Sequence, residues 1–348
     1  MPGTFERHTA VSDVAREWDD LCDRVGAMPW VRSGWIDAWW RAFGRGTLEL
    51  VLLRRDGRPA AAAPLVRRRG ALRSATNWHT PAYELPAEDD DALAELAHEL
   101  YRGVRSVELR FLAAGVPRLR EAARARGWPT TERVVLRSPY VPAEGTFDEY
   151  VGSLSRSRRT DLRRQRRRLT EHCGEVELEL FTTPEEAEAH LEEAFRLEGS
   201  GWKTDDGTAI LSRPDTTAFY ADVVRWAASE GTLRLAFLSA GGTRVAVEIG
   251  ILAQRSFHVL KSGYDVEYRN YGPGMLLQAS LLEWVWAEGL RGYELLGDAD
   301  RYKLEWTPHV HERVLLHAFS RSVAGAAERL AVVHGRPLAK RALAAVGR

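Results

Sequence analysis

The sequence predicts an α/β protein with mixed sheets, because stretches with strand and helix patterning alternate along the whole chain. The strand-like runs are short and rich in branched residues, whereas the stretches between them show helical spacing of apolar residues. Both halves follow a similar order of elements, which is consistent with a duplicated fold, although no short repeat occurs. A chain of 348 residues has the length of about two domains.

The composition is that of an ordinary globular protein, with 45% hydrophobic and 28% charged residues. The formal net charge is zero, so the chain as a whole is not a polycation for nucleic acids or membranes. No apolar run is long enough to span a membrane, and the polar N-terminus is unlike a signal peptide. Only Cys22 and Cys173 are present, so we expect no disulfide framework and a reducing, cytoplasmic location.

The N-terminal half is expected to contain a hairpin of strands at residues 48–54 and 60–69. Its turn, Asp56-Gly57, is typical of tight hairpins. A helix at residues 92–101 follows acidic residues, which favour a helix N-terminus. The other expected elements are strands at residues 72–78, 104–112 and 131–137 and a helix at residues 116–126. Segment 138–145, with two prolines, is the expected linker.

The C-terminal half is expected to begin with a long basic helix at residues 154–171 and a strand at residues 176–181. Thr183 is a favourable cap for a helix at residues 184–197. The elements expected after it are a helix at 216–229, strands at 233–239, 244–252 and 256–263, a helix at 275–288, strands at 292–296 and 313–320, and a helix at 324–341. This pattern predicts an N-terminal module at 1–145, a C-terminal module at 146–322 and a helical tail at 323–348.

The most informative motif is a glycine turn, residues 269–274, between a strand and a helix. The first amides of a helix lack intrahelical partners and the helix dipole adds positive charge, so such a turn can bind a phosphate group. A plain turn is the alternative. Leu277 stands where a dinucleotide fingerprint has its third glycine, and no Gly-Lys-Ser/Thr follows, which excludes both a Rossmann fingerprint and a P-loop.

The spacing Arg-x-x-Gly-x-Gly in this turn resembles the acyl-coenzyme A (acyl-CoA) loop of the GNAT N-acyltransferases. Residues from about 150 to 320 resemble the CelD-like branch of that family, which is similar to the FemAB-type peptidyltransferases. The elements that carry the resemblance are the arginine-rich helix 155–169, Gly201-Trp202-Lys203, Gly263-Tyr264-Asp265, Tyr268-Arg269, Gly272-Pro273-Gly274, Leu276-Leu277, Gly292, Gly297-Asp298, Tyr302-Lys303 and Trp306. Before residue 145, only Gly34-Trp35 to Trp40 and the general layout resemble it.

The resemblance implies two tandem GNAT-like modules, each a mixed, mostly antiparallel sheet flanked by helices. It also implies that one strand, here residues 258–264, splays from its neighbour and that an acyl-CoA thioester enters the gap. The residues expected to bind this co-substrate are Lys261, Arg269, Tyr271, Gly272, Gly274, Met275 and Lys303, and those expected to bind the acceptor are Trp202 and Lys203. Only four of the 49 basic residues are lysines, so Lys203, Lys261 and Lys303 stand out as candidate ligand-binding residues. No metal is expected.

Four residues are candidate catalytic groups. Glu248 shares one face of an apolar strand with small residues, as on a cleft wall, and could be a general base; a solvent-facing residue is the alternative. Asp298 follows a strand at its carboxyl end, where open α/β sheets place ligands, and a helix cap is the alternative. Tyr264 and Tyr302 are candidates to donate a proton to the departing thiolate.

Two further clusters have alternative interpretations. Eight arginines between Arg156 and Arg168 can contact RNA phosphates or an anionic substrate, or can form a solvated face, and the zero net charge favours the solvated face. His309 and His311 alternate on an expected strand, but no third ligand is spaced to complete a metal site with them.

Together these features predict an N-acyltransferase that moves an acyl group, acetyl in the first instance, from acyl-CoA to an amine of a small molecule or saccharide precursor. One alternative is FemAB-type transfer from an aminoacyl-tRNA. Another is a non-catalytic GNAT-like binding protein in a biosynthetic complex. The amine acceptor is the expected binding partner, and tRNA would be a partner under the first alternative. No membrane association is expected. The protein is expected to be a monomer or a homodimer.

Overall fold

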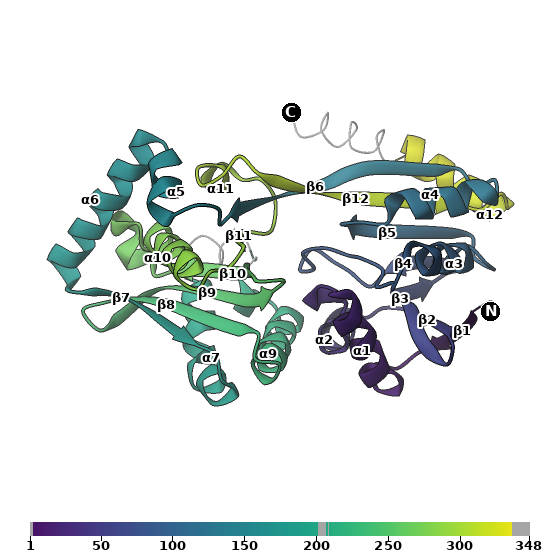
Figure 1. Ribbon diagram of the computed structural model, residues 1–348, viewed down its shortest axis with the longest axis horizontal. Coiled ribbons are helices and arrows are strands. Elements are labelled where there is room, and N and C mark those ends of the chain that lie inside the picture. Colours follow the sequence, from purple (N-terminus) through teal and green to yellow (C-terminus); the bar gives the residue numbers. More distant parts are fainter. Residues whose placement is uncertain (1–2, 201–206, 208, 336–348) are drawn as a thin grey trace. The chain divides into compact units, whose positions relative to one another are not determined.

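The computed structural model describes residues 3–200, 207 and 209–335, and the chain divides into two compact units (Figure 1). The N-terminal unit holds the described residues of 1–40, 44–135 and 313–348, and the C-terminal unit holds those of 41–43 and 136–312. The chain passes between the units at the end of helix α2 (Ser33–Phe43) and within two strands, β6 (Thr130–Pro142) and β12 (Val310–Phe319). These boundaries differ from those expected near residues 145 and 322, because most of segment 138–145 continues strand β6 instead of forming a linker.

The N-terminal unit is built on a mixed sheet with the strand order β1-β2-β3-β4-β5-β12-β6. The pairs from β1 to β4 are antiparallel, β4 and β5 are parallel, and β5 and β12 are antiparallel. The hairpin turn between β2 and β3 has Asp56 and Gly57 at φ of 51° and 80°, which confirms the predicted Asp-Gly turn. The first five strands are β1 (Thr4–His8), β2 (Thr47–Arg55), β3 (Arg58–Arg68), β4 (Ala71–Ser74) and β5 (Ser106–Leu112).

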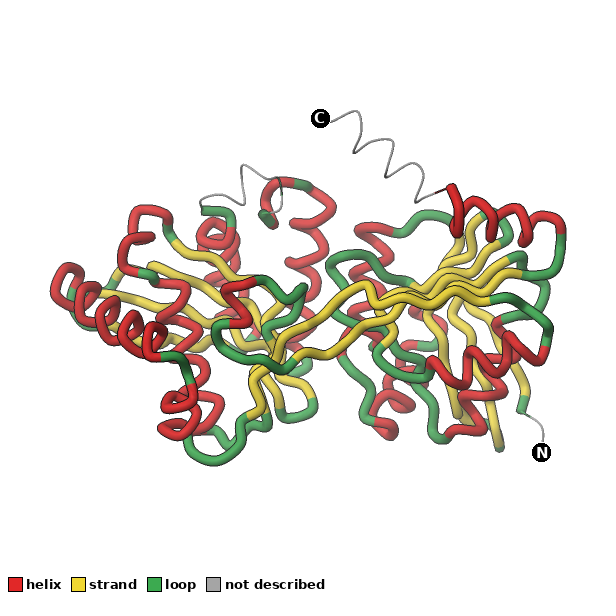
Figure 2. Tube along the Cα trace, turned by 90° about the horizontal axis from the view of Figure 1, so that it is seen from above, coloured by secondary structure: helices red, strands yellow, loops and turns green. Residues whose placement is uncertain are grey.

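Helices lie against this sheet (Figure 2). Their apolar side chains face it. Trp18 and Leu21 of α1 form one hydrophobic cluster with Leu50 and Leu52 of β2. Helix α3 begins where the Asp89 carboxylate accepts the N–H of Ala92, as the acidic start predicts. The helices that contribute to this unit are α1 (Ala15–Val25), α2 (Ser33–Phe43), α3 (Asp90–Leu100), α4 (Val116–Ala125) and α12 (Val323–Leu330).

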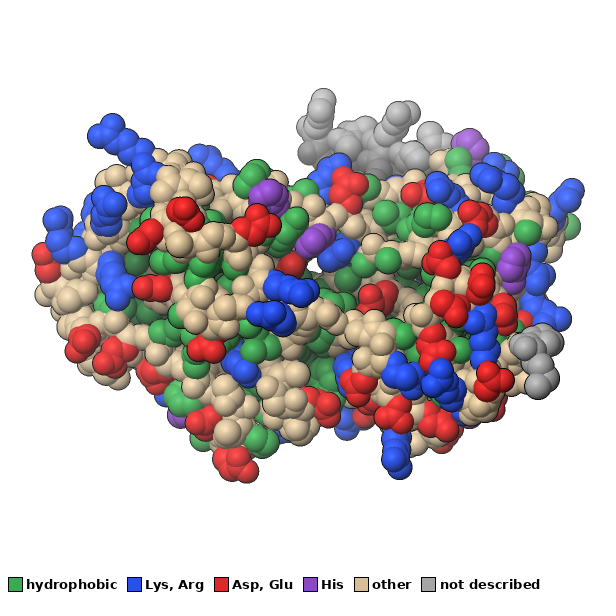
Figure 3. Space-filling view, in the orientation of Figure 1, with side chains coloured by type: hydrophobic (Ala, Val, Ile, Leu, Met, Phe, Trp, Pro, Cys, Tyr) green, Lys and Arg blue, Asp and Glu red, His purple; other side chains and the backbone are tan. Residues whose placement is uncertain are grey.

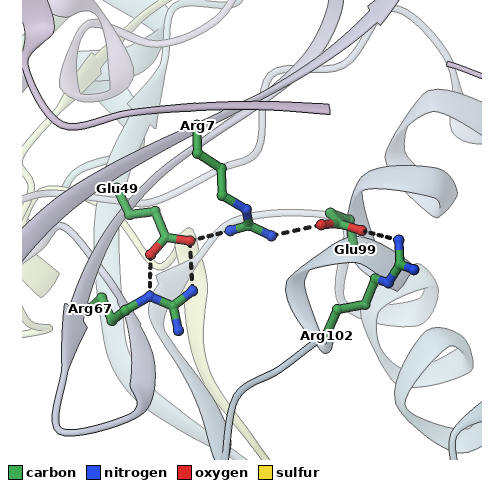
Figure 4. A network of polar contacts seen from close by, with 5 residues as sticks. All are labelled: Arg7, Glu49, Arg67, Glu99 and Arg102. Atoms are coloured by element: carbon green, nitrogen blue, oxygen red, sulfur yellow. Dashed lines mark hydrogen bonds and ion pairs between the residues drawn. The ribbon is translucent and has the colours of Figure 1, made fainter. Parts of the chain in front are cut away.

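A chain of ion pairs ties three strands of this unit to α3 (Figure 4). The carboxylate of Glu49 on β2 accepts hydrogen bonds from Arg67 on β3 and from Arg7 on β1. The other side of Arg7 donates to Glu99 of α3 at 2.7 Å, and Glu99 also accepts from Arg102 at 3.1 Å. Since Glu49 is only 6% exposed, its two arginines compensate for the loss of water around a buried carboxylate.

The C-terminal unit has its own mixed sheet, with the strand order β6-β11-β10-β9-β8-β7. The strands from β10 to β7 pair antiparallel, β10 and β11 pair parallel, and β11 and β6 pair antiparallel. The strands not yet given are β7 (Val176–Phe181), β8 (Leu233–Ala240), β9 (Thr243–Ala253), β10 (Ser256–Tyr264) and β11 (Gly292–Glu294). The mixed, mostly antiparallel sheet flanked by helices is the predicted fold class.

Helices cover both faces of this second sheet. A Cβ on Gly263 of β10 would meet the backbone of Glu198 in α7, whereas the next residue, Tyr264, lies against Gly274 of α10. Successive residues of a strand point to opposite faces, so α7 and α10 lie on opposite faces of β10. The helices of this unit are α5 (Phe147–Ser153), α6 (Arg156–Cys173), α7 (Pro184–Glu198), α9 (Pro214–Ser229), α10 (Pro273–Ala287) and α11 (Arg301–Leu304).

Local signals explain where two of these helices begin. Thr183 and Glu186 form a capping box at the start of α7, as predicted from the threonine. Helix α10 buries Leu276, Leu277 and Leu281 between the sheet and α6. Within the described residues, no helix has both the length and the apolar character that crossing a membrane requires.

Candidate active site

The strand β10 separates from β11 in the middle of the C-terminal sheet. Residues 256–258 of β10 pair with β11, and the later residues of the strand pair with β9 alone among the described strands. Strand β11 ends at Glu294, after which Leu296 and Gly297 take positive φ values of 51° and 61° and turn the chain away. The predicted splay is therefore confirmed for residues 259–264, while His258 still pairs with Glu294 of β11, and it leaves one edge of β10 open to a ligand.

A cavity of about 370 Å³ adjoins the open end of β10. Its size lies within the range of small-molecule pockets, about 300–1,000 Å³. Residues from β9, β10, α6, α10 and α11 contribute to it, together with the glycine turn. The lining residues are Arg158, Ser200, Val247, Glu248, Ser262, Gly263, Tyr264, Arg269, Gly272, Pro273, Gly274, Met275, Leu277, Gln278, Tyr302 and Trp306.

The glycine turn brings the start of α10 to this cavity. Gly272 caps the helix in the left-handed conformation, with φ 60° and ψ 45°, which glycine adopts without a Cβ penalty. Pro273 has no N–H, so the helix's free amides begin at Gly274. A Cβ on Gly274 would lie only 3.2 Å from the Tyr264 ring, so this glycine keeps the backbone close to β10. Backbone amides and a helix dipole at a cavity wall form a favourable anion site.

Two arginines flank the turn in different ways. Arg269 is exposed, and its guanidinium makes no ion pair with the residues that the structure describes. Arg158 of α6, by contrast, is nearly buried, with 10% of its side chain exposed. It pairs with Glu305 at 2.8 Å, donates to the Tyr302 carbonyl at 3.2 Å and lies over the Trp306 ring at 4.5 Å. Burial lowers the pKa of Arg158, and its Nε finds no partner within the described ranges.

Glu248 is a buried carboxylate on the cavity wall. It is 1% exposed, so the alternative of a solvent-facing residue is wrong. Its neighbours across the sheet are Ala236 on β8 and Ser262 on β10, in keeping with the expected face of small residues. The hydroxyl of Tyr293 donates to Glu248 Oε2 at 2.5 Å. Burial and the nearby carboxylate hold the pKa of Tyr293 well above its usual value, so this phenol remains a donor that orients Glu248.

Tyr264 and Tyr302 also line the cavity. Tyr302 is 51% exposed as a whole residue, but partial desolvation of its hydroxyl, with Asp300 and Glu248 nearby, raises its pKa to about 12. A free alkyl thiol has a pKa of about 8.5, so Tyr302 holds its proton more tightly than a thiol does. The phenol is therefore suited to donate a hydrogen bond to a departing thiolate more than to give up its proton completely.

The sequence of this unit matches a known family. Residues 156–304 match the family model described as an acetyltransferase (GNAT) domain. The C-terminal unit contains a GNAT domain. The resemblance to the GNAT N-acyltransferases, which the glycine turn suggested, is thus confirmed for residues 156–304. A comparison with curated protein sequences gives no match.

Solved structures resemble the chain over most of its length. The C-terminal domain of a protein described as a lysylphosphatidylglycerol synthetase, from Agrobacterium fabrum, has 11% identity and a TM-score of 0.56, over 93% of this chain and 97% of that one. FemX has 12% identity and a TM-score of 0.56, over 89% and 96%. A conserved protein of unknown function from Bacteroides thetaiotaomicron has 12% identity and a TM-score of 0.55, over 91% and 100%. At such identities the likeness shows the fold alone.

Three predicted site residues of the GNAT domain lie away from the cavity. The ammonium of Lys303 donates to the carbonyls of Leu296 and Asp298, at 2.8 and 3.1 Å, and so fixes the turn after β11. Asp298 accepts the N–H groups of Arg137 and Ala299, and Asp300, not Asp298, occupies the cap position of α11. Lys261 pairs with Glu198 at 3.6 Å, on the α7 side of the sheet. The geometry gives these three residues structural partners, and their proposed roles stay predictions.

The remaining predicted residues have mixed placements. Arg269, Gly272, Gly274 and Met275 line the cavity. Tyr271 instead stacks on His172, with ring centroids 5.1 Å apart, and packs beside Arg168 of α6. The acceptor residues Trp202 and Lys203 lie outside the described residues.

No metal centre is evident in the described part of the chain, where no three potential ligands of the His, Cys, Asp or Glu type come together. The histidine pair has other neighbours. His311 stacks on Tyr140 at 3.9 Å and lies 3.2 Å from a Glu294 oxygen, and His309 lies on the same tyrosine at 5.6 Å.

Gln278 is a cavity residue that the sequence reasoning missed. It is 8% exposed, and its amide makes no hydrogen bond with the described residues. The amide is not among the fully buried polar atoms that lack a partner, so it faces the cavity, where water or a ligand can pair with it. The signal in the sequence was a glutamine within the apolar stripe of α10, between Leu277 and Leu281.

Replacing Gln278 with methionine is expected to raise the free energy of unfolding by about 1 kcal/mol, because a largely buried side chain whose amide has no protein partner in the described residues becomes apolar at nearly constant volume. The same change is expected to lower kcat/KM of the GNAT domain. Urea denaturation and initial rates measure the two effects. Leu277→Met is the matched control on α10, since it changes shape without changing polarity. A less stable Gln278→Met protein would show that the amide is already satisfied in the free protein.

Proposed function

We propose that the protein is an N-acyltransferase that uses acyl-CoA, with acetyl-CoA as the first donor to test, and an amine of a small molecule or saccharide precursor as acceptor. The observation that supports this most directly is the separation of β10 from β11 beside a cavity that has free helix amides on one side and a buried carboxylate on the other. The matching GNAT family model supports the same class of reaction.

In this proposal the donor lies along the open edge of β10. The backbone of residues 259–264 has hydrogen-bonding groups on the side away from β9, and these can pair with the amides of a pantetheine arm. The pyrophosphate contacts the amides at the start of α10 and the guanidinium of Arg269. Gly272 and Gly274 allow this close approach, because a side chain at either position would occupy the space of the pyrophosphate.

The reaction needs no covalent enzyme intermediate. The amine nitrogen bonds to the thioester carbonyl carbon while the carbon–sulfur bond breaks. Glu248 accepts the proton that the amine loses, Tyr293 holds this carboxylate in place, and Tyr302 donates a hydrogen bond to the leaving sulfur. A proton from Glu248 or from solvent then converts the thiolate to free CoA thiol. The cavity contributes by holding amine and thioester within reacting distance.

Native mass spectrometry of the purified protein tests the donor, because an acyl-CoA that co-purifies reveals its own acyl group. Isothermal titration with CoA then measures the affinity. We expect a Kd in the micromolar range, which corresponds to a binding free energy of about −8 kcal/mol. Absence of any CoA binding would overturn the proposal. CoA binding without transfer to any amine in a panel of polyamines, amino acids and amino sugars would favour a non-catalytic binding protein.

A second candidate, transfer from an aminoacyl-tRNA, is favoured by one feature of α6. Arg156, Arg163 and Arg166 are exposed and form no ion pair with other described residues. Figure 3 shows Lys and Arg side chains gathered over this helix. The fold of FemX resembles this chain, but likeness at 12% identity does not assign a donor.

A gel shift with tRNA tests this second candidate. Binding through three arginines should weaken steeply with salt, with log Kd rising with log salt at a slope of roughly +2 to +3. Replacing Arg156, Arg163 and Arg166 with glutamate should abolish the shift. Binding that survives this triple replacement would exclude the α6 face as the tRNA contact.

A further inference from the structure

A second concave site lies entirely within the N-terminal unit. It is a cleft of about 640 Å³ between α4, the start of β6 and the segment that joins β12 to α12. Neither the GNAT family match nor the glycine turn involves it, since the family match ends at residue 304 and begins at residue 156. The lining residues that matter for its chemistry are Arg120, Arg124, Gly127, Trp128, Arg321 and Arg329.

The charge of the cleft is of one sign. Four of its lining residues are arginines and none is acidic. Arg120 has a partner outside the cleft, Glu132, at 3.5 Å. Arg124, Arg321 and Arg329 make no ion pair with any described residue, although ion pairs satisfy many other arginines of this unit. Like charges that converge in one hollow repel each other and focus a positive potential there, and a bound anion relieves that repulsion.

The walls of the cleft are held in place by contacts behind them. The turn after α4 is closed by the hydrogen bond from the Trp128 N–H to the Ala123 carbonyl, at 2.9 Å. Helix α12 is anchored by Glu328, which pairs with Arg105 at 2.9 Å and accepts from Ser106 at 2.8 Å. Both sides of the cleft therefore stand on fixed backbone, which limits the entropy lost when a ligand binds.

Trp128 adds an aromatic surface between the arginines. Its ring packs against Tyr101 behind it, with centroids 5.3 Å apart. Its indole N–H makes no hydrogen bond within the described part of the chain and is a further donor. Arg321 lies against the backbone of the same turn, because a Cβ on Gly127 would be 3.4 Å from its guanidinium.

We propose that this cleft binds a small molecule that carries two or more phosphate groups. Guanidinium forks match phosphate oxygens with paired hydrogen bonds, and three uncompensated charges balance about two phosphate groups of −1.5 to −2 each. The cleft has the volume of a small-ligand site, in the range of about 300–1,000 Å³. This site is separate from the proposed acyl transfer and does not depend on it.

Inorganic pyrophosphate is the probe, measured by isothermal titration with the full chain. The glycine turn of the GNAT domain would also bind pyrophosphate under the proposed function, so the titration uses Gly274→Trp as background. We expect binding in that background to persist, and to weaken at least about tenfold for each arginine removed in Arg124→Ser and Arg321→Ser. The matched control is Arg126→Ser with Arg133→Ser, two exposed arginines of the same unit that do not line the cleft.

Thermal unfolding gives a second readout. Removing two like charges from the cleft should leave the melting temperature unchanged or higher without ligand, and pyrophosphate should raise it in the control but not in the Arg124→Ser, Arg321→Ser protein. If the double variant fails to fold, Arg329→Ser alone is titrated in its place. Equal pyrophosphate affinity in the cleft variant and its control would overturn the proposal, as would no binding in the Gly274→Trp background.

Discussion

Replacing Glu248 with glutamine is expected to lower kcat for acyl transfer by about 10²–10⁴-fold, the usual contribution of a positioned general base. The carboxylate is the one acidic side chain that lines the cavity of the GNAT domain, within the residues that the structure describes. Glutamine keeps the size of the side chain and can still accept the hydrogen bond from Tyr293, so the fold should be retained. Steady-state rates at saturating acyl-CoA measure the loss.

Asp298→Asn is the matched control for this variant. The Asp298 carboxylate accepts backbone N–H groups at 3.0 and 3.1 Å and does not line the cavity, so kcat should change little. Loss of activity in Asp298→Asn with full activity in Glu248→Gln would assign the base to the other carboxylate. Full activity in the double variant would show that transfer proceeds without a protein base.

The central elements of both units could be predicted because their sequence signals are local. The Asp-Gly turn fixes the hairpin of β2 and β3, and Thr183 marks the start of α7. The strands β8, β9 and β10 have tight turns between them, and their predicted ends differ from the observed ones by one residue at most. In each case a turn or cap residue defines the boundary without help from distant contacts.

The N-terminal helices and the boundary between units were missed for tertiary reasons. Helix α1 has a polar outer face and a narrow apolar stripe that contains Trp18 and Leu21. This stripe is buried only by packing against β2, a strand about 30 residues later in the chain. Residues Pro139 and Pro142 suggested a linker, yet β6 continues through Pro139 and ends only at Pro142. Proline lacks only the N–H, so a strand tolerates it where that group is not needed for pairing.

The candidate site was predictable where the chemistry follows from strand alternation. Glu248 stood out as a carboxylate among small residues on an apolar strand, and it does line the cavity. Lys303 was selected for its rarity in an arginine-rich chain, but its short-range partners are carbonyls of its own turn. Arg158 was hidden among eight arginines of one helix, because which of them is buried depends on Trp306 and Met275, more than 100 residues away.

Replacing Gly274 with tryptophan is expected to weaken CoA binding at least about 100-fold, a loss of about 2.7 kcal/mol. A Cβ at this position already lies 3.2 Å from the Tyr264 ring, so a larger side chain must enter the space between α10 and β10. That space is the cavity of about 370 Å³ in which the donor is proposed to lie. Gly274→Ala should give an intermediate loss, because only one methyl group must be accommodated. Isothermal titration with CoA measures both variants.

Gly152→Trp is the matched control, since a Cβ there meets nothing within 4 Å and Gly152 does not line the cavity. Overpacking alone costs about 1–3 kcal/mol of stability, so the melting temperature of each variant separates unfolding from lost affinity. A folded Gly274→Trp protein that binds CoA as wild type does would place the donor elsewhere. A CoA affinity that falls from Gly274→Ala to Gly274→Trp, with Gly152→Trp unaffected, would instead place the donor where β10 separates from β11. The glycine turn and the open edge of β10 meet at this point.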